Sequence, residues 1–492
     1  MHHALQIQEI LFNIFGHCYQ YSALSGDIDQ HSSSDVAALA RTCRAFKEPA
    51  LDVLWQELDE LSPLVRCVPK ASHQLSSEDD MPGIDHKCFL NLLKPPMTEP
   101  LFLNVCKLRF QYPDDKHLLL ATLPSLMSLS IRLNDPRSFE DSLRLFAKIS
   151  PSLANLYIDP DHYACIDMDR IDRKFICHWR NLQSFSCSEM PLDMTTLVHL
   201  SRLPALVNLS FMLPSTLPDQ ISLSDSPLIF SNLKQLLLHS EFLSPVSHLL
   251  SKIRLPAVTD LAAWIDFRPA RQDLSLFFAN VRTSGSPRTI QALRLIQPHN
   301  WGETSVPGDK PVLGLEDLQL YVPFSNLRRV QLDIEWKIDL TDSELLTLVS
   351  RWPCLEELRI NTIWGWNTLG GITPNGLLQL LQSCPLLTVI ALPIDTRAEI
   401  PPSSTSLGFL PPRYTIDFVD SFIEEESVPA IAAFIASLMA FSKLHFHAWA
   451  NFGMRAPYRD VCSNRWSDVR SRLRIGFKVL FLVSSWPGID IL

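Results

Sequence analysis

The stretch Leu126-Met127-Ser128-Leu129-Ser130-Ile131 carries the pattern that decides the fold. It places an apolar residue, two variable residues, a second apolar residue, one variable residue and a third apolar residue in a row. Alternation of this kind predicts a short strand with one buried face. The pattern recurs with starts 24 to 37 residues apart, at Leu126–Ile131, Leu153–Ile158, Leu182–Cys187, Leu206–Phe211, Leu233–Leu238, Val258–Ala263, Ile290–Leu295, Leu327–Leu332, Leu355–Ile360 and Leu387–Leu392. Val105–Phe110 is a candidate for an earlier copy.

Segments with helical patterning lie between these strand-like copies. We expect helices at 141–149, 195–203, 244–253, 273–281, 341–352 and 373–383, and Thr341 with Glu344 has the spacing of a capping box. One strand plus one helix at this period resembles the degenerate leucine-rich repeat. We therefore expect an α/β solenoid with parallel strands on the concave face and helices outside. A doubly wound α/β enzyme fold also alternates strands and helices, but the Gly-rich first turn or catalytic loop ends that it needs are not found.

Composition and charge narrow the functional class. The 492 residues carry a net charge of −10, which disfavours a nucleic-acid binder or an anionic-membrane binder. No signal peptide is visible, and the longest apolar run, 430–441, is too short to span a bilayer. The 11 cysteines are scattered, without a C-x-x-C motif. We expect a soluble protein of the cytoplasm, the nucleus or both, with reduced cysteines and no nucleic-acid or membrane partner.

Motifs of catalysis and cofactor binding are missing from the sequence. The phosphate-binding, dinucleotide-binding, zinc-protease, serine-hydrolase and calcium-loop patterns do not occur. His445 and His447 could place two imidazoles on one strand face, but a third metal ligand at a recognisable spacing is lacking, which favours ordinary packing. We expect no enzyme activity, no cofactor and no metal.

Residues 4–61 form a separate helical unit by their patterning. Ile7, Ile10, Leu11, Ile14 and Phe15 share one helix face. A second helix follows the polar stretch that ends near Ser34, and Pro49 suits the first turn of a third helix. We expect a connector at residues 62–100, the solenoid at 101–400 and a capping region at 401–492. Within the capping region, the apolar patterning predicts helices at 428–441 and 466–473 and a buried strand at 477–483.

The helical unit resembles an F-box. The resemblance rests on Glu9 to Phe15, on Leu39 to Phe46 and on Pro49 to Trp55, and it is greatest with the variant of fungal proteins that carry degenerate leucine-rich repeats. Two features differ from the family. The chain has Leu5-Gln6-Ile7-Gln8 in place of the family's Leu-Pro start, and the stretch at residues 16–34 is longer than it usually is in the family.

The resemblance implies a substrate-recognition subunit of a cullin–RING ubiquitin ligase, docked on a Skp-type adaptor. It assigns ten residues to the docking face or to the core directly beneath it, with the two roles left open for each: Leu5, Ile7, Ile10, Leu11, Ile14, Phe15, Leu39, Phe46, Leu51 and Trp55. The alternative is a non-catalytic repeat scaffold whose degenerate F-box recruits no ligase.

The variable positions of the repeats predict a surface for an unidentified target protein. They are small and polar in the early repeats, and become Arg294, Arg329, Gln331, Glu357 and Arg359 in the later ones. Three arginines suit bidentate recognition of carboxylate or phosphate, although a solvated charged face would look the same.

Tryptophans add a second hint about the target surface. Trp264, Trp301, Trp336, Trp364 and Trp366 each follow a strand-like copy. The Trp364-Gly365-Trp366 loop suits an exposed aromatic rim, and the alternative is that these rings fill gaps beneath irregular repeats.

Overall fold

The computed structural model describes residues 7–23, 31–58, 106–111, 126–133, 150, 152–160, 173–214, 227–298, 310–366, 371–401, 413–439, 443–449 and 459–484. The chain divides into two compact units, Met1–Met212 and Leu213–Leu492. The predicted connector at 62–100, Leu5 and Trp301 lie outside the described residues.

The first unit begins with three helices that pack on one another. They are α1 (Gln8–Ala23), α2 (His31–Ala40) and α3 (Arg44–Leu54). Leu11, Phe15, Val36, Ala50 and Val53 form their buried core. The prediction for Pro49 is wrong, because α3 begins at Arg44 and Pro49 lies inside it. Phe46 packs edge-on against Phe15, which draws the residues before Pro49 into the helix.

A parallel sheet starts directly after these helices. Strand β1 (Glu57–Leu58) pairs with β2 (Lys107–Gln111), and each later strand of the unit adds in parallel to the one before it. These strands are β3 (Ser128–Leu133), β4 (Asn155–Pro160), β5 (Ser184–Pro191) and β6 (Asn208–Met212). The 3₁₀ helix η5 (Arg173–His178) precedes β5, and α8 (Met194–Ser201) connects β5 to β6.

The second unit has the same arrangement of parallel strands and connecting helices. Its main sheet consists of parallel strands in chain order: β8 (Gln235–Ser240), β10 (Asp260–Ile265), β11 (Ala292–Ile296), β13 (Arg329–Asp333), β15 (Glu357–Ile360), β16 (Val389–Ala391), β17 (Arg413–Asp417) and β18 (Lys443–His447). Two short parallel pairs lie outside this sheet: β7 (Leu228–Ile229) with β9 (Ile253–Arg254), and β12 (Val312–Leu313) with β14 (Lys337–Ile338).

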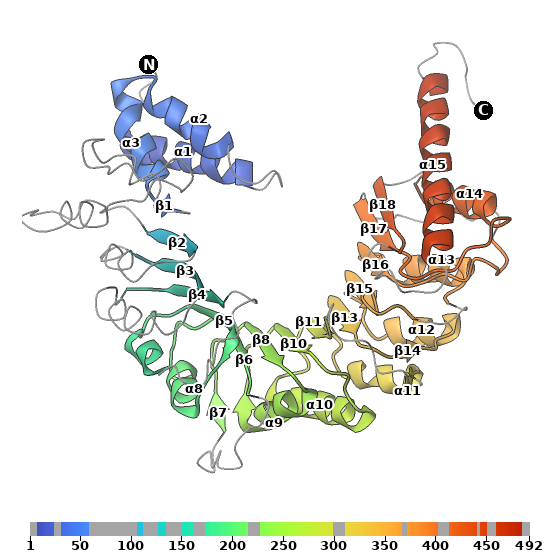
Figure 1. Cartoon of the computed structure of the whole chain (residues 1–492), viewed down its shortest axis with the longest axis horizontal. Helices are drawn as coiled ribbons and strands as arrows, with labels where there is room; N and C mark the ends of the chain where they lie inside the picture. Colours follow the sequence, from blue (N-terminus) through green and yellow to red (C-terminus); the bar gives the residue numbers. More distant parts are fainter. Residues whose placement is uncertain are drawn as a thin grey trace, which may run out of the picture. The chain divides into compact units, whose positions relative to one another are not determined.

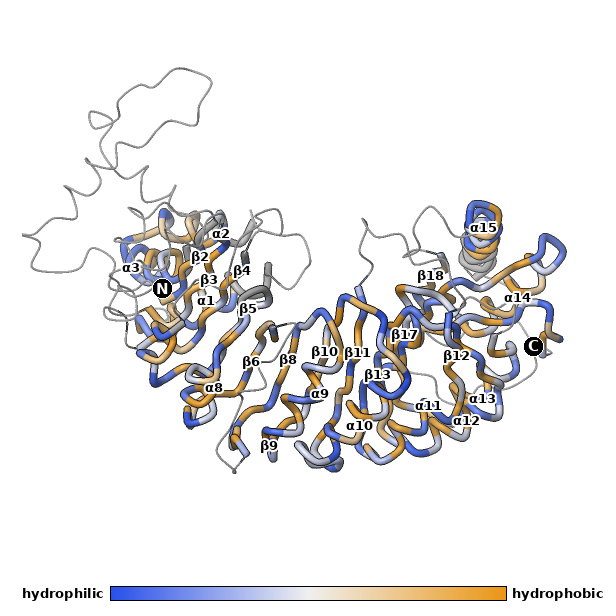
Figure 2. Tube along the Cα trace, turned by 60° about the horizontal axis from the view of Figure 1, so that its bottom comes forward, coloured by the Kyte–Doolittle hydropathy of each residue, from blue (hydrophilic) through white to orange (hydrophobic). Residues whose placement is uncertain are grey.

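Helices cover one face of the second unit's sheet and leave the other face without helices (Figure 1). They are α9 (Leu243–Lys252), α10 (Arg271–Ser284), α11 (Leu315–Leu318), the 3₁₀ turn η6 (Gln319–Tyr321), α12 (Asp342–Val349), α13 (Pro374–Ser383), α14 (Val428–Met439) and α15 (Arg459–Ser484). In Figure 2 these helices carry both hydrophobic and hydrophilic residues along their length, as amphipathic helices do. The predicted α/β solenoid class is confirmed.

The end of the chain differs from the expectation. Strands β17 and β18 continue the sheet beyond residue 400, and the sequence Phe441–Phe446 at β18 has the apolar spacing of the repeat. The predicted strand at 477–483 is wrong, because these residues belong to α15. A short apolar run alone does not distinguish a strand from a buried helix. Trp466 of α15 stacks on Phe418 with 4.9 Å between the ring centroids, and this packing anchors the helix beside the last strands.

Candidate functional site

The helical unit separates the predicted adaptor-binding residues into two groups. Leu11 and Phe15 are buried and complete the unit's own core. Leu39 and Phe46 pack partly buried against that core, and Leu51 and Trp55 are half-buried. The structure therefore gives Leu11 and Phe15 a role within the core, which the sequence had left open.

The other group forms an exposed apolar stripe on α1 and the residue before it. Ile7, Ile10 and Ile14 are 47%, 37% and 42% exposed. Residues three and four positions apart lie on one side of a helix, so the three side chains share a face. Within the described residues nothing covers this face. We refer to these three residues as the isoleucine stripe.

The second unit brings the predicted target-binding residues together on the helix-free face of its sheet. Parallel register aligns Arg294, Gln331 and Arg359 in one row across β11, β13 and β15. Arg329 and Glu357 are neighbours in the adjacent row. Their side chains point away from the helices because Val330, Leu332 and Leu358 occupy the buried positions between them.

Each arginine of this charged face is already paired with a carboxylate of the same chain. The Asp260 carboxylate accepts a hydrogen bond from Arg294 at 2.8 Å and lies 3.4 Å from the Arg329 guanidinium. Arg359 pairs with Glu357 on its own strand. Asp260 is nearly buried while the arginines are about one-third to one-half exposed, so the guanidinium groups lie above a recessed carboxylate.

Sequence reasoning missed Asp260, although its position carried the signal. Asp260 occupies the same variable position of its repeat as Arg329 and Glu357 do in theirs. Asp417 on β17 is a second missed carboxylate, and burial raises its pKa, an effect that the Val419 amide, His447 and Arg359 partly offset. The face is therefore one of mixed charge rather than a basic one.

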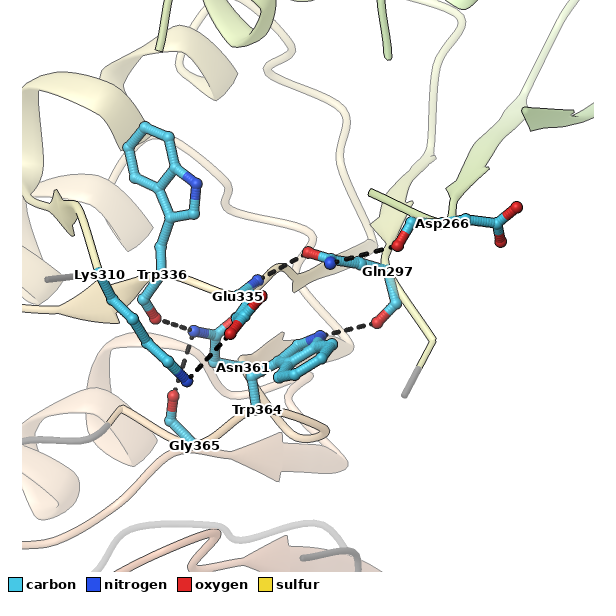
Figure 3. Close-up of polar contacts among 8 residues, drawn as sticks. All are labelled: Asp266, Gln297, Lys310, Glu335, Trp336, Asn361, Trp364 and Gly365. Carbon is cyan, nitrogen blue, oxygen red and sulfur yellow. Dashed lines mark hydrogen bonds and ion pairs between the residues drawn. The ribbon is translucent and has the colours of Figure 1, made fainter. Parts of the chain in front are cut away.

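A polar network joins the loops that follow β10, β11, β13 and β15 (Figure 3). The Gln297 side chain donates to the Asp266 carbonyl at 3.4 Å and accepts from the Glu335 amide at 2.9 Å. Trp364 donates its indole N–H to the Gln297 carbonyl at 2.8 Å. These contacts fix the carboxyl ends of four strands relative to one another.

Asn361 is the centre of this network. Its Oδ1 accepts from the Ile334 amide at 2.9 Å, and its Nδ2 donates to the Trp336 and Gly365 carbonyls at 2.7 and 3.2 Å. The side chain is fully buried, and the backbone φ of 53° lies in the left-handed region that asparagine tolerates better than most residues.

A lysine and a carboxylate lie beside Trp364. The Lys310 ammonium is 5.6 Å from the centroid of the Trp364 ring and 3.6 Å from the Glu335 carboxylate. Glu335 is nearly buried, and its Oε1 has no hydrogen-bond partner, so the ion pair with Lys310 is what offsets its burial.

The tryptophans do not form the predicted rim as a group. Trp336 and Trp366 are both buried, with indole N–H groups bonded to the Pro269 and Ile360 carbonyls. The prediction of an exposed Trp366 is therefore wrong, because its ring fills the space beneath the loop after β15. Trp364 is half-buried, and Trp264 is exposed.

The described residues contain no group of three or more His, Cys, Asp or Glu side chains that could hold a metal ion. His445 and His447 are both exposed on β18. Among the helices in the described ranges, none is both long enough and apolar enough to cross a bilayer.

Comparison with known proteins adds little beyond the fold. No family model matches the chain, and no curated protein matches it. Among solved structures, the chain is similar to one from the crystal structure of a Rad7 and Elc1 complex in yeast, with 14% identity and a TM-score of 0.39. The similarity covers 83% of this chain and 92% of that chain. At this level it carries no functional argument.

Proposed function

We propose that this chain is the substrate-recognition subunit of an SCF-type cullin–RING ubiquitin ligase. Its helical unit would dock on a Skp-type adaptor, and its solenoid would bind the target protein. The sequence resemblance of residues 4–61 to an F-box supports the adaptor side. The isoleucine stripe is the single structural observation that carries it.

The isoleucine stripe favours a protein partner for a physical reason. Burying apolar surface stabilises a complex by about 25 cal/mol per Å², and the unit needs none of the three isoleucines to complete its own core. Single exposed apolar residues are common, but three on one face of a short helical unit indicate a contact surface. Leu11 and Phe15 would support that surface from beneath.

The charged face of the second unit is the proposed target side. Arg294, Arg329 and Arg359 are held in place by Asp260 and Glu357, so little side-chain freedom remains to be lost on binding. A face with recessed carboxylates beneath guanidinium groups matches a partner of mixed charge better than a phosphorylated one, because a phosphate would also be repelled by those carboxylates. Gln331 and Trp364 would contribute at its centre and edge.

In this proposal the chain catalyses no bond chemistry itself. It would hold the target close to an activated ubiquitin, and proximity would supply the rate enhancement. Because the proposed partners operate in the cytoplasm and the nucleus, we infer an intracellular location, which microscopy of a fluorescent fusion would test.

The adaptor interaction is testable with surface variants that spare the core. In a pull-down with a purified Skp-type adaptor, we expect the wild type to bind and the double variant Ile10→Asp, Ile14→Asp to lose binding. Gln8→Glu adds a charge to an exposed position of the same helix, on another side from Ile10 and Ile14, and should bind as the wild type does. Leu11 is unsuitable for substitution because it is buried in the core.

The outcomes separate the two candidate functions. A folded wild-type chain that fails to bind the adaptor would contradict the proposal and favour the scaffold with a degenerate F-box. Equal loss of binding in the Gln8→Glu control would show that the helix, rather than the isoleucine stripe, had been perturbed.

A further inference from the structure

The charged face of the second unit has one positively charged end. Arg294 and Arg329, on the neighbouring strands β11 and β13, both pair with the Asp260 carboxylate on β10. Two guanidinium groups against one carboxylate leave a net charge of +1. The Asp260 side chain is only 8% exposed, whereas those of Arg294 and Arg329 are 36% and 49% exposed. The positive charge is therefore the part that a partner would meet, and we call these two arginines the positive pole.

The same face carries a half-buried carboxylate further along the sheet. Parallel register aligns Arg359 on β15 with Ala391 on β16 and Asp417 on β17. Ile390 and Ile416 fill the alternate, buried positions, so Asp417 faces the same helix-free side as the arginines. Ala391 places only a methyl group between Arg359 and Asp417 in this row.

This second end of the charged face is negative. Glu357 pairs with Arg359 on its own strand, and Asp417 adds a second carboxylate to this one guanidinium, which leaves a net charge of −1. Burial raises the pKa of Asp417, and His447 and Arg359 are among the groups that lower it, so the carboxylate lies within electrostatic reach of both. The fully buried Asp333 carboxylate also raises that pKa and adds to the negative charge here. We call Glu357 and Asp417 the negative pole.

The two poles lie a fixed distance apart because one sheet carries both. The positive pole lies on β11 and β13, and the negative pole lies on β15 and β17, with β16 between these two strands. Neighbouring strands are about 4.8 Å apart, so the centres of the poles are separated by about two and a half strand spacings, or about 12 Å. An extended polypeptide advances about 3.4 Å per residue, so about three or four residues span that distance.

We propose that the charged face binds an extended segment of the target protein that carries a carboxylate side chain and a lysine or arginine about three or four residues apart. The carboxylate pairs with the exposed guanidinium groups of Arg294 and Arg329, and the cation pairs with Glu357 and Asp417. Complementary charges at both poles fix the register of the segment and disfavour segments with one sign of charge. The inference rests on the proposed function in taking this face as the target side, but it needs neither the adaptor nor the isoleucine stripe.

The test uses biotinylated peptides with blocked termini, bound to tetravalent streptavidin because multivalency compensates for weak single contacts. The first probe, Ser-Glu-Gly-Ser-Gly-Lys-Ser, holds its two charges apart, and the second, Ser-Gly-Glu-Lys-Gly-Ser-Ser, has the same composition with adjacent charges. Biolayer interferometry measures their binding to the immobilised full-length chain at low salt and about pH 8, where histidines are ordinarily neutral. We expect the first probe to bind at least about threefold more tightly, a difference typical of one exposed ion pair.

Variants of the chain test each pole. Arg329→Glu should weaken binding of the first probe at least about threefold and strengthen binding of a third probe with lysine in place of glutamate, which a misfolded chain would not do. Asp417→Asn keeps the oxygen that accepts from the Val419 amide at 2.9 Å and should weaken binding of the first probe by removing charge alone. Arg282→Glu makes the same charge change as Arg329→Glu at an exposed position of α10, on the other side of the sheet, and should leave binding unchanged.

Three results would overturn the inference: equal binding of the first two probes, no binding of the first probe, or equal effects of Arg329→Glu and Arg282→Glu. None of these results bears on the pull-down with the adaptor, so failure here is distinguishable from failure of the proposed function.

Discussion

Replacement of Asn361 tests whether the polar network stabilises the second unit as its geometry indicates. In Asn361→Ala the buried Ile334 amide loses its acceptor, and the Trp336 and Gly365 carbonyls lose their donor. A buried polar group left without a partner costs about 1–3 kcal/mol, and cooperative loss of three contacts suggests about 2–4 kcal/mol. Alanine in the left-handed region costs about 1–2 kcal/mol more.

The free energy of unfolding should therefore fall by about 3–6 kcal/mol in Asn361→Ala. Asn361→Gly loses the same hydrogen bonds but accepts a φ of 53° without strain, so it should be about 1 kcal/mol less destabilised than the alanine variant. Urea denaturation followed by tryptophan fluorescence measures both, because Trp336, Trp364 and Trp366 surround the site. Asn326→Ala, an exposed asparagine with one hydrogen bond to the Arg288 carbonyl, is the matched control.

Two results would refute this reasoning. A loss below about 1 kcal/mol in Asn361→Ala would mean that water or rearranged side chains replace the three contacts. A glycine variant less stable than the alanine variant would mean that the left-handed backbone is not a source of strain at this position.

Three further predictions concern single contacts. Gly376→Ala should destabilise the second unit by about 1–3 kcal/mol in urea denaturation. The added methyl group would overlap the Asp342 carboxylate, which accepts hydrogen bonds from Thr373. In an Asp342→Ala background the same substitution should be neutral or stabilising. Burial lowers the pKa of His239 from 6.5 to about 4, so the unfolded chain takes up a proton first on acidification, and stability should fall by roughly 3 kcal/mol between pH 6.5 and 4. A flat profile, or no change in slope with His239→Gln, would contradict this. Asp260→Asn should lower stability by about 1 kcal/mol, less at high salt, because the arginines that it pairs with are partly exposed.

The sequence by itself determined the repeating architecture. Strand β3 and the nine later copies of the pattern lie where the apolar spacing predicted them, and Thr341 caps α12 with Glu344 as the capping box implied. These features depend on residues within a few positions of one another, so local periodicity and hydrogen bonding specify them. The face shared by Arg294, Gln331 and Arg359 followed from the same spacing.

Only the tertiary structure decided which residues of each pattern are available to a partner. Leu11 and Ile10 are adjacent and both apolar, yet the packing of α2 and α3 buries the first and leaves the second exposed. Asp260 meets Arg329 from 69 positions away, and Trp336 bonds Pro269 from 67 positions away. Contacts between residues so distant in sequence depend on the register of neighbouring strands, and no pattern within a single repeat specifies them.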